Sequence, residues 1–373
     1  MKIGILTFCN GYNYGAMLQC FALQEYLNKN GIEAEVINFK KEKKYSKTGI
    51  NFLSPSYMLR KTYSFLYKLQ IETKHREFNK FFKDKVKHYP SCSLNEKTIN
   101  AEIKKYDIIL FGSDQIWNMD EKIYDRSKIF FGEFDFSGKK ISYAASFGDS
   151  ISVAVNNIEY IKKMLRKFDS ITVREKTAVE FLKKINIDSS MVCDPTLLLT
   201  SDDWNKIIEK PNNKKIPSKY ILYYSVNCRK YSWKIAKKIA KKTGLKVINL
   251  EEHPKIIGSG FMNDYMEGPA QFLYLIKNAE YVVTNSFHGT IFSIIFKRNL
   301  IPVFEQKNGE IVKEERKYSI LEAAGLLEMV TTESSSLKLN YYNKQVYSKI
   351  EKNIKKLTEV SKDFLKKSCG EKK

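Results

Sequence analysis

The stretch Tyr281-Val-Val-Thr-Asn-Ser-Phe-His-Gly-Thr290 decides the fold class of this chain. It opens with an apolar run that predicts a short buried strand, and the apolar run after Gly289 predicts a helix. His288 falls in the turn between them, and turns at the carboxyl ends of parallel strands are where open α/β sheets bind ligands. Two interpretations stay open at this point: His288 contacts a ligand, or it is a buried histidine held by neighbouring hydroxyl groups.

Short apolar strands alternate with longer helical patterns along most of the chain, which predicts parallel sheets covered by helices. A polar stretch between Asp194 and Pro217 breaks the pattern, which restarts with a strand at Tyr220. The length of 373 residues also exceeds what one hydrophobic core usually serves. We therefore predict an α/β fold with two Rossmann-like domains around a cleft, residues 1–196 and 219–373, joined by a linker over 197–218. The amphipathic segment 344–367 is expected to form a helix that packs back on the body.

The sequence has no run of about 18 apolar residues, and its first residues enter a strand without the pattern of a signal peptide. These features predict a cytoplasmic protein. The net charge is +22, most of it from lysines spread over many predicted helix faces. A field of that sign favours nucleic acid, anionic membranes or anionic substrates. Nothing resembles a nucleic-acid-binding module, so no nucleic-acid partner is predicted. Two denser basic stretches, 39–68 and 342–373, are candidates for peripheral contact with an anionic membrane.

The six cysteines are scattered, with no CxxC pair and no close cluster with histidine. This spacing predicts reduced thiols and gives no support for a zinc site. The sequence shows no carboxylate cluster that demands a divalent ion either. We therefore predict neither a bound metal nor a cofactor, and the sequence gives no prediction of the oligomeric state.

The loop after the first strand, Cys9 to Ala16, carries glycines and asparagines that permit tight backbone conformations. It leads into a predicted helix, and free backbone N–H groups at a helix start favour an anion or a sugar hydroxyl. The loop lacks the GxGxxG pattern of dinucleotide-binding turns. An ordinary connecting loop is the alternative. As a binding loop it would contribute Asn10, Tyr12, Asn13 and Gly15.

A dense polar cluster follows the apolar strand that ends near Gly112, and it suits sugar hydroxyls, which need paired donors and acceptors. Its members are Ser113, Asp114, Gln115 and Asn118, with Trp117 as a candidate stacking surface for a sugar. Asp114 is a candidate base, although capping a helix is an alternative role for Ser113 or Asp114.

Two further strand ends carry candidate residues. Ser146 and Gly148 end a strand in small side chains, which let a ligand come close. Arg174 stands at the end of another strand, and its planar fork suits a carboxylate or a phosphate. A plain ion pair is the alternative for Arg174.

Taken together, these segments resemble the polysaccharide pyruvyl transferase family. The resemblance rests on an ordered set that covers most of residues 1–305: ILTFCNGYNYGAMLQCFALQEYL, DIILFGSDQIWN, ISYAASFG, ITVREKTAVEFL, VCDPTLLL and FLYLIKNAEYVVTNSFHGTIFSIIF. It implies a GT-B-like arrangement of two domains around a cleft. It also implies a pyruvyltransferase that moves a unit from phosphoenolpyruvate onto a free or lipid-linked sugar of a bacterial surface polysaccharide, as a ketal.

The resemblance also implies roles for individual residues. His288 is the candidate general acid, or a cationic group that binds the donor phosphate. Arg174 matches an arginine that contacts the donor in studied members, and Asp114 is the weaker candidate for deprotonating the attacking hydroxyl. Asn285, Ser286 and Gly289 complete the predicted substrate site around His288.

One position departs from the family pattern. Several studied members carry an arginine two residues before the equivalent histidine, and this chain has Ser286 there. Either another loop supplies this charge, with Arg229, Lys230, Lys255, Arg316 and Lys317 as candidates, or the donor is a different anion.

Two alternative functions follow from other features of the sequence. A glycosyltransferase of similar fold that uses a nucleotide sugar is one, with the loops at Glu251-Glu252 and Glu267-Gly268 as its candidate nucleotide site. A basic polyanion-binding protein without catalysis is the other, because it explains the net charge.

Overall fold

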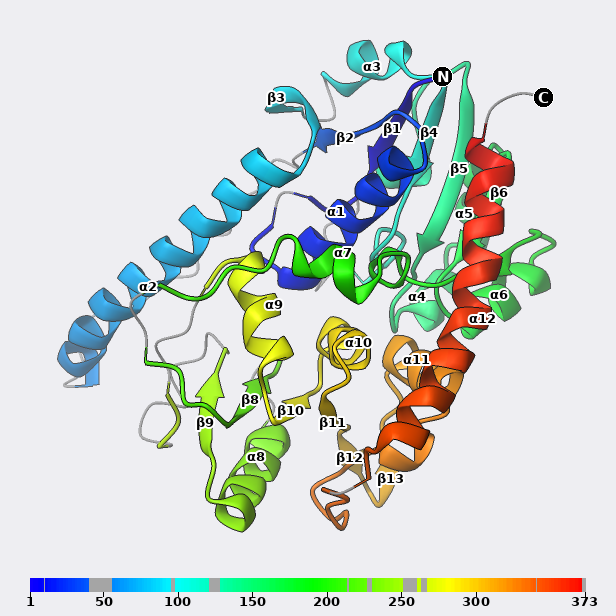
Figure 1. Ribbon diagram of the computed structural model, residues 1–373. Coiled ribbons are helices and arrows are strands. Elements are labelled where there is room, and N and C mark those ends of the chain that lie inside the picture. Colours follow the sequence, from blue (N-terminus) through cyan, green and yellow to red (C-terminus); the bar gives the residue numbers. More distant parts are fainter. Residues whose placement is uncertain are drawn as a thin grey trace.

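Two parallel β-sheets and the helices that cover them make up the computed structural model (Figure 1). The structure describes residues 1–9, 11–39, 56–94, 98–120, 128–212, 215–226, 230–250, 260–262, 267–339 and 341–370. It shows the α/β class and the two sheets that the strand and helix pattern predicts.

The first sheet has seven parallel strands in the order β3-β2-β1-β4-β5-β6-β7. The order reverses between β1 and β4, and such a switch point is where open α/β sheets bind ligands. The apolar residues of β1 and β4 are fully buried, as expected for a sheet covered on both faces. The strands are β1 (Ile3–Leu6), β2 (Ala34–Phe39), β3 (His88–Leu94), β4 (Ile108–Phe111), β5 (Lys139–Ala145), β6 (Ser170–Val173) and β7 (Ser190–Met191).

The helix α1 (Tyr14–Lys29) begins where the side chain of Asn13 accepts a hydrogen bond from the backbone N–H of Ala16. Such a cap satisfies one of the free N–H groups of a helix start. The helices and 3₁₀ turns that follow are α2 (Ser56–Lys85), α3 (Ile99–Glu102), η1 (Ile103–Lys105), η2 (Lys128–Phe131), α4 (Ile151–Val155), α5 (Ile158–Leu165) and α6 (Lys176–Lys184).

The second sheet has four parallel strands in the order β11-β10-β8-β9, and its order reverses between β8 and β10. Its strands are β8 (Tyr220–Tyr224), β9 (Lys246–Asn249), β10 (Tyr281–Thr284) and β11 (Asn299–Pro302). A small hairpin follows, made of β12 (Gln306–Lys307) and β13 (Glu310–Ile311). The associated helices and turn are α8 (Lys230–Thr243), α9 (Pro269–Lys277), α10 (Phe287–Ile295), α11 (Glu315–Ala324) and η5 (Leu327–Met329).

The connection between the sheets contains the turn η3 (Pro195–Leu197) and the short helix α7 (Ser201–Asn205). The last helix, α12 (Lys344–Cys369), runs back along both sheets, as Figure 1 shows at its red end. Its Ser361 Oγ accepts a hydrogen bond from the backbone N–H of Cys193 at 2.8 Å, next to the first sheet. Asn353 donates to the carbonyl of Ala324 at 3.3 Å, at the end of α11. The prediction that a C-terminal helix packs back on the body is confirmed.

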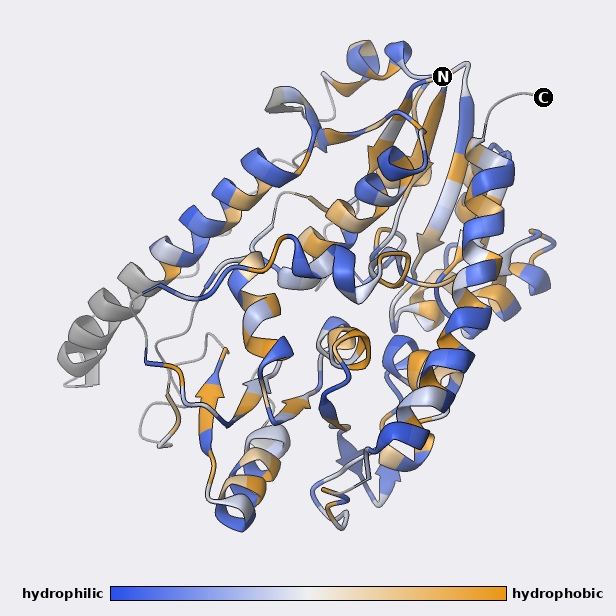
Figure 2. Ribbon diagram, viewed as in Figure 1, coloured by the Kyte–Doolittle hydropathy of each residue, from blue (hydrophilic) through white to orange (hydrophobic). Residues whose placement is uncertain are grey.

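One continuous apolar core joins the two sheets. The rings of Tyr14 and Phe272 stack at 4.3 Å, and Trp204 meets Phe292 edge to face at 5.0 Å. Figure 2 shows apolar segments of α1, α9 and α10 facing one another in the interior. These helices come from both halves of the chain. Their packing therefore holds the two sheets so that their carboxyl ends face the same space.

The structure corrects two predicted details. Strand β3 was not expected. Helix α10 begins at Phe287 and not at Gly289, because Ser286 caps it by accepting a hydrogen bond from the backbone N–H of Gly289 at 3.3 Å. His288 therefore lies in the first turn of the helix. Among the described helices, none combines the length and apolar character that crossing a bilayer requires.

Candidate functional site

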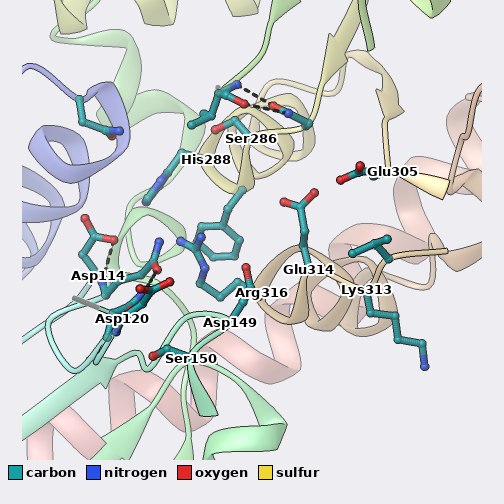
Figure 3. Close-up of a pocket in the computed structure, with 17 residues that line it drawn as sticks. Asp114, Asp120, Asp149, Ser150, Ser286, His288, Glu305, Lys313, Glu314 and Arg316 are labelled. Atoms are coloured by element: carbon teal, nitrogen blue, oxygen red, sulfur yellow. Dashed lines mark hydrogen bonds between the residues drawn. The ribbon is translucent and has the colours of Figure 1, made fainter. Parts of the chain in front are cut away.

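A cavity of about 350 Å³ lies where the switch points of the two sheets meet (Figure 3). Most of its walls come from loops just beyond the carboxyl ends of parallel strands, and the rest comes from the residues just before α11 and from its first turn. This is the position at which α/β sheets hold ligands. The lining residues are Asn13, Asp114, Gln115, Asn118, Asp120, Asp149, Ser150, Val226, Asn285, Ser286, Phe287, His288, Glu305, Val312, Lys313, Glu314 and Arg316.

The wall from the first sheet carries polar side chains after β1, β4 and β5. Asp114 follows β4 with a positive φ of 73°, a left-handed conformation that aspartate tolerates better than most residues. Its Oδ1 accepts a hydrogen bond from the backbone N–H of Gln115 at 2.8 Å. Asn118 Nδ2 donates to Gln115 Oε1 at 2.7 Å, which holds both amides in place at the cavity. These amides and Asp114 offer the paired donors and acceptors that a sugar hydroxyl needs.

The wall from the second sheet is fixed by Asn285, which pairs with the end of β8. Its Oδ1 accepts from the backbone N–H of Val226 at 2.7 Å, and its Nδ2 donates to the Val226 carbonyl at 3.1 Å. These two bonds join the loops at the switch point between β8 and β10. They hold the start of α10, and with it His288, against the cavity.

His288 lies at the centre of a buried polar cluster. Its Nε2 is 3.6 Å from Oδ2 of Asp194, a separation typical of an ion pair and longer than a hydrogen bond. Arg174 donates to the same oxygen of Asp194 at 2.7 Å, and its other terminal nitrogen is 3.7 Å from Oδ1 of Asp114. The guanidinium also faces the ring of Phe287 at 4.5 Å. Residues from both sheets therefore converge on one carboxylate.

Asp194 keeps its negative charge although it is completely enclosed. Burial by itself raises the pKa of this carboxyl group. The neighbouring His288 and Arg174, together with a hydrogen bond from Thr196, outweigh burial and hold the pKa well below its ordinary value. At neutral pH the cluster thus contains a fixed anion.

The cavity wall carries both signs of charge. The basic groups among the described lining residues are Lys313, Arg316 and His288. The five carboxylates in the lining are Asp114, Asp120, Asp149, Glu305 and Glu314. Figure 3 shows Arg316 and Glu314 directed into the space that His288 borders. Of the five candidates for the missing donor charge, the structure places Arg316 in the cavity.

Lys317, another of those candidates, is buried behind the wall. Its Nζ donates to the carbonyls of Val303 at 2.7 Å and Asn285 at 3.1 Å, and to Oε1 of Glu314 at 3.1 Å. Burial lowers the pKa of Lys317 to about 8. Lys317 therefore positions the wall and does not face a ligand. Arg229 and Lys255 lie outside the described residues, as do the side chain of Lys230 and the predicted nucleotide loop at Glu251-Glu252.

Seven of the predicted site residues line the cavity: Asn13, Asp114, Gln115, Asn118, Asn285, Ser286 and His288. Arg174 lies one layer behind it with its side chain 2% exposed, so its contact with a donor stays a prediction. Ser113 is buried there too and donates to Asp194 at 3.1 Å. Asn10 lies outside the described residues.

The remaining predicted residues have other surroundings. Trp117 cannot stack on a sugar in this structure, because its indole is completely buried and donates to the carbonyl of Phe130 at 2.9 Å. Tyr12 is exposed and stacks on His75, away from the cavity lining. Ser146, Gly15 and Gly289 are buried, and none of the three lines the cavity. None of these five residues lines the cavity, and their direct contact with a substrate stays a prediction.

Several site residues were missed from the sequence. Asp149 and Glu305 follow β5 and β11, so the rule that ligands bind beyond the carboxyl ends of parallel strands could have found them. Lys313 and Glu314 precede α11 in a charged run without periodic pattern. Asp194 falls at the end of the first predicted domain without a predicted role, and its contacts depend on packing that brings distant segments together.

Within the described ranges, no group of three or more His, Cys, Asp or Glu side chains is arranged to hold a metal ion. The absence of a metal or cofactor from the reaction stays a prediction.

The fold and the cavity define an α/β protein with a cavity where two parallel sheets share their carboxyl edges. A family model described as polysaccharide pyruvyl transferase matches residues 13–304. The chain belongs to the polysaccharide pyruvyl transferase family. No curated protein matches it in a sequence search.

Several solved structures are similar to the chain at low sequence identity. A UDP-N-acetylglucosamine 2-epimerase from Rickettsia bellii has 10% identity and a TM-score of 0.48, covering 99% of this chain and 98% of the other. A UDP-GlcNAc 2-epimerase from Methanocaldococcus jannaschii has 12% identity and a TM-score of 0.48, covering 96% and 93%. An alpha-glucosyltransferase in complex with UDP and a 13-mer DNA has 11% identity and a TM-score of 0.47, covering 98% and 91%.

Proposed function

We propose that this protein transfers a pyruvyl group from phosphoenolpyruvate onto a sugar of a bacterial surface polysaccharide or its lipid-linked precursor, forming a pyruvate ketal. The observation that carries the proposal is the position of His288, a buried histidine at the cavity with the charged carboxylate of Asp194 behind it. Histidine is the side chain that most often serves as a general acid, and this one lies 3.6 Å from the Asp194 carboxylate through its Nε2. Family membership supplies the reaction class.

The first step on this proposal is proton transfer from His288 to the methylene carbon of phosphoenolpyruvate. The carbon-carbon double bond becomes a methyl group, and the adjacent carbon becomes electrophilic. One sugar hydroxyl attacks that carbon, phosphate leaves with its bridging oxygen, and a second hydroxyl attacks to close the ketal. The two hydroxyl protons balance the proton taken up by carbon and the proton carried away by hydrogen phosphate.

The remaining roles follow from where the cavity residues lie. Arg316 is the cation best placed for the phosphate or carboxylate of the donor, since it lines the cavity together with His288. Asp114 is the candidate base for the attacking hydroxyl, because its carboxylate lines the same space. Gln115, Asn118 and Asn285 supply donors and acceptors for sugar hydroxyls.

A lipid-linked acceptor would bring the protein to the inner face of a membrane. Helix α12 offers exposed lysines for contact with anionic headgroups at that surface. They are Lys344, Lys349, Lys352, Lys355, Lys356, Lys366 and Lys367.

The experiment incubates the protein with phosphoenolpyruvate and a panel of p-nitrophenyl glycosides of galactose, glucose, mannose and N-acetylglucosamine. Released phosphate and the acceptor mass are both measured. The proposal expects phosphate release that depends on one of the glycosides, with a mass gain of one pyruvyl unit on that acceptor. Thermal protection by a UDP-sugar with none from phosphoenolpyruvate would favour the nucleotide-sugar alternative, and salt-sensitive RNA binding without turnover would favour the polyanion-binding one.

A further inference from the structure

Asp194 differs from the other carboxylates near the cavity because its side chain is completely buried and both of its oxygens are occupied. Oδ1 accepts from the backbone N–H of Thr196 at 3.0 Å and from its hydroxyl at 2.6 Å. Oδ2 accepts from Arg174 at 2.7 Å and from Ser113 at 3.1 Å, and it is the oxygen nearest to His288. Thr196 fixes one oxygen, so the other keeps a constant direction.

The carboxylate also lies at a particular place in the fold. Asp194 is the N-cap of η3, at the start of the connection between the two sheets. Arg174 follows β6 of the first sheet, whereas His288 lies in the first turn of α10 of the second sheet. Asp194 is therefore the anion that both an arginine following the first sheet and a histidine of the second sheet approach.

We propose that Asp194 is a positioning residue that holds Arg174 and the imidazole of His288 in the site and supplies the negative charge that His288 faces during proton transfer. Without the anion, two basic groups would face each other in a buried space, and their repulsion would favour a neutral imidazole. The role in proton transfer rests on the proposed function, whereas the effect on the charge of His288 does not. The other charged groups of this cluster and of the cavity that His288 lines are Arg174, Asp114, Asp120, Asp149, Glu305, Lys313, Glu314 and Arg316.

The variant Asp194→Asn tests this role. The amide can keep one acceptor toward Thr196, and it replaces the anion that faces His288 with a neutral group. The matched control is Asp203→Asn, because Asp203 completes the capping box of α7 in the same connection, accepts from the backbone N–H and hydroxyl of Thr200 through its Oδ2, and lies outside the cavity lining. Circular dichroism and urea unfolding establish that both variants fold.

The readout is the pH titration of the imidazole C2 proton of His288 by NMR, assigned by its loss in His288→Gln. We expect His288 to lose its proton at a pH lower by about one unit or more in Asp194→Asn than in the wild type, and at an unchanged pH in Asp203→Asn. An unchanged titration in folded Asp194→Asn would overturn the proposal. This measurement needs no substrate, so failure of the phosphoenolpyruvate assay counts against the proposed function alone.

A second variant covers the case in which Asp194→Asn does not fold. Thr196→Val keeps the carboxylate and removes one of the two bonds that fix its Oδ1. We expect the titration of His288 to move in the same direction by a smaller amount. If folded Thr196→Val titrates like the wild type, the fixed direction of Asp194 has no effect on His288 and the proposal is wrong.

Discussion

Gly15 of α1 lies directly against the imidazole ring of His288 in α10. A Cβ atom added to Gly15 would overlap Nδ1 of His288, and the next nearest atoms belong to the same ring. One face of the histidine is therefore closed by a helix of the first sheet, while Asp194 stands near Nε2. The close approach of the His288 ring accounts for glycine at position 15. Its backbone conformation does not, because its φ is outside the left-handed region.

The variant Gly15→Ala is expected to displace the ring of His288 and to lower the pyruvyl transfer rate by about tenfold to a hundredfold, because a misplaced catalytic group loses its geometry. Turnover of phosphoenolpyruvate with an accepted glycoside measures the effect. Gly11→Ala is the matched control, because a Cβ at Gly11 meets no described atom within 4 Å. Equal rates in the two variants would show that the contact between α1 and His288 does not matter for turnover.

The variant Arg316→Ala is expected to raise the phosphoenolpyruvate concentration needed for half-maximal rate by about tenfold to a hundredfold. That range corresponds to losing one charge-assisted hydrogen bond to an anion. Steady-state kinetics with varied phosphoenolpyruvate measure the change. Lys344→Ala removes an exposed charge from α12 and is expected to leave the kinetics unaltered. An unchanged KM in Arg316→Ala would remove this residue from the donor site.

Lys317 gives a prediction on the pH dependence of stability. Burial lowers its pKa from 10.5 to about 8. Below pH 8 the folded protein therefore carries a proton on an enclosed amine, and this lowers the free energy of unfolding. Between pH 8 and 10.5 the unfolded chain binds more protons than the folded one at this residue, and stability from this group therefore rises with pH.

Urea unfolding of the wild type and of Lys317→Met, at pH 7.5 and pH 10, isolates this contribution. Other groups that titrate in this range, such as the buried thiols, are common to both proteins and cancel in the difference. The stability of the wild type relative to Lys317→Met is expected to rise by up to about 3 kcal/mol over this range. A difference that stays constant or falls would contradict the account of Lys317 as a buried amine.

The sequence predicted most of the sheet strands because their apolar runs are short and bounded by polar turns. Strand β3 was missed since its residues, His88-Tyr-Pro-Ser-Cys-Ser-Leu94, contain a proline and few apolar side chains. It is the edge strand of its sheet, where proline is tolerated. An edge strand of this kind depends on its neighbour β2 more than on its own sequence pattern.

The candidate site was predicted as far as strand ends could be located. Asp114, Asn285 and His288 follow strands with a plain apolar pattern, and all three line the cavity. The surroundings of Trp117 and Asp194 could not be predicted, because they depend on segments distant in sequence. Trp117 is enclosed by residues of η2, and Asp194 meets a histidine 94 positions later in the chain.

The central claim is that His288 protonates the methylene carbon of phosphoenolpyruvate during transfer to a sugar. The most direct test is the reaction with an accepted glycoside in deuterium oxide, followed by mass spectrometry and NMR of the product. The account predicts one pyruvyl unit per acceptor with one deuterium in its methyl group, equimolar phosphate, and loss of the product in His288→Gln. Product with no deuterium in the methyl group, or undiminished turnover by His288→Gln, would contradict it.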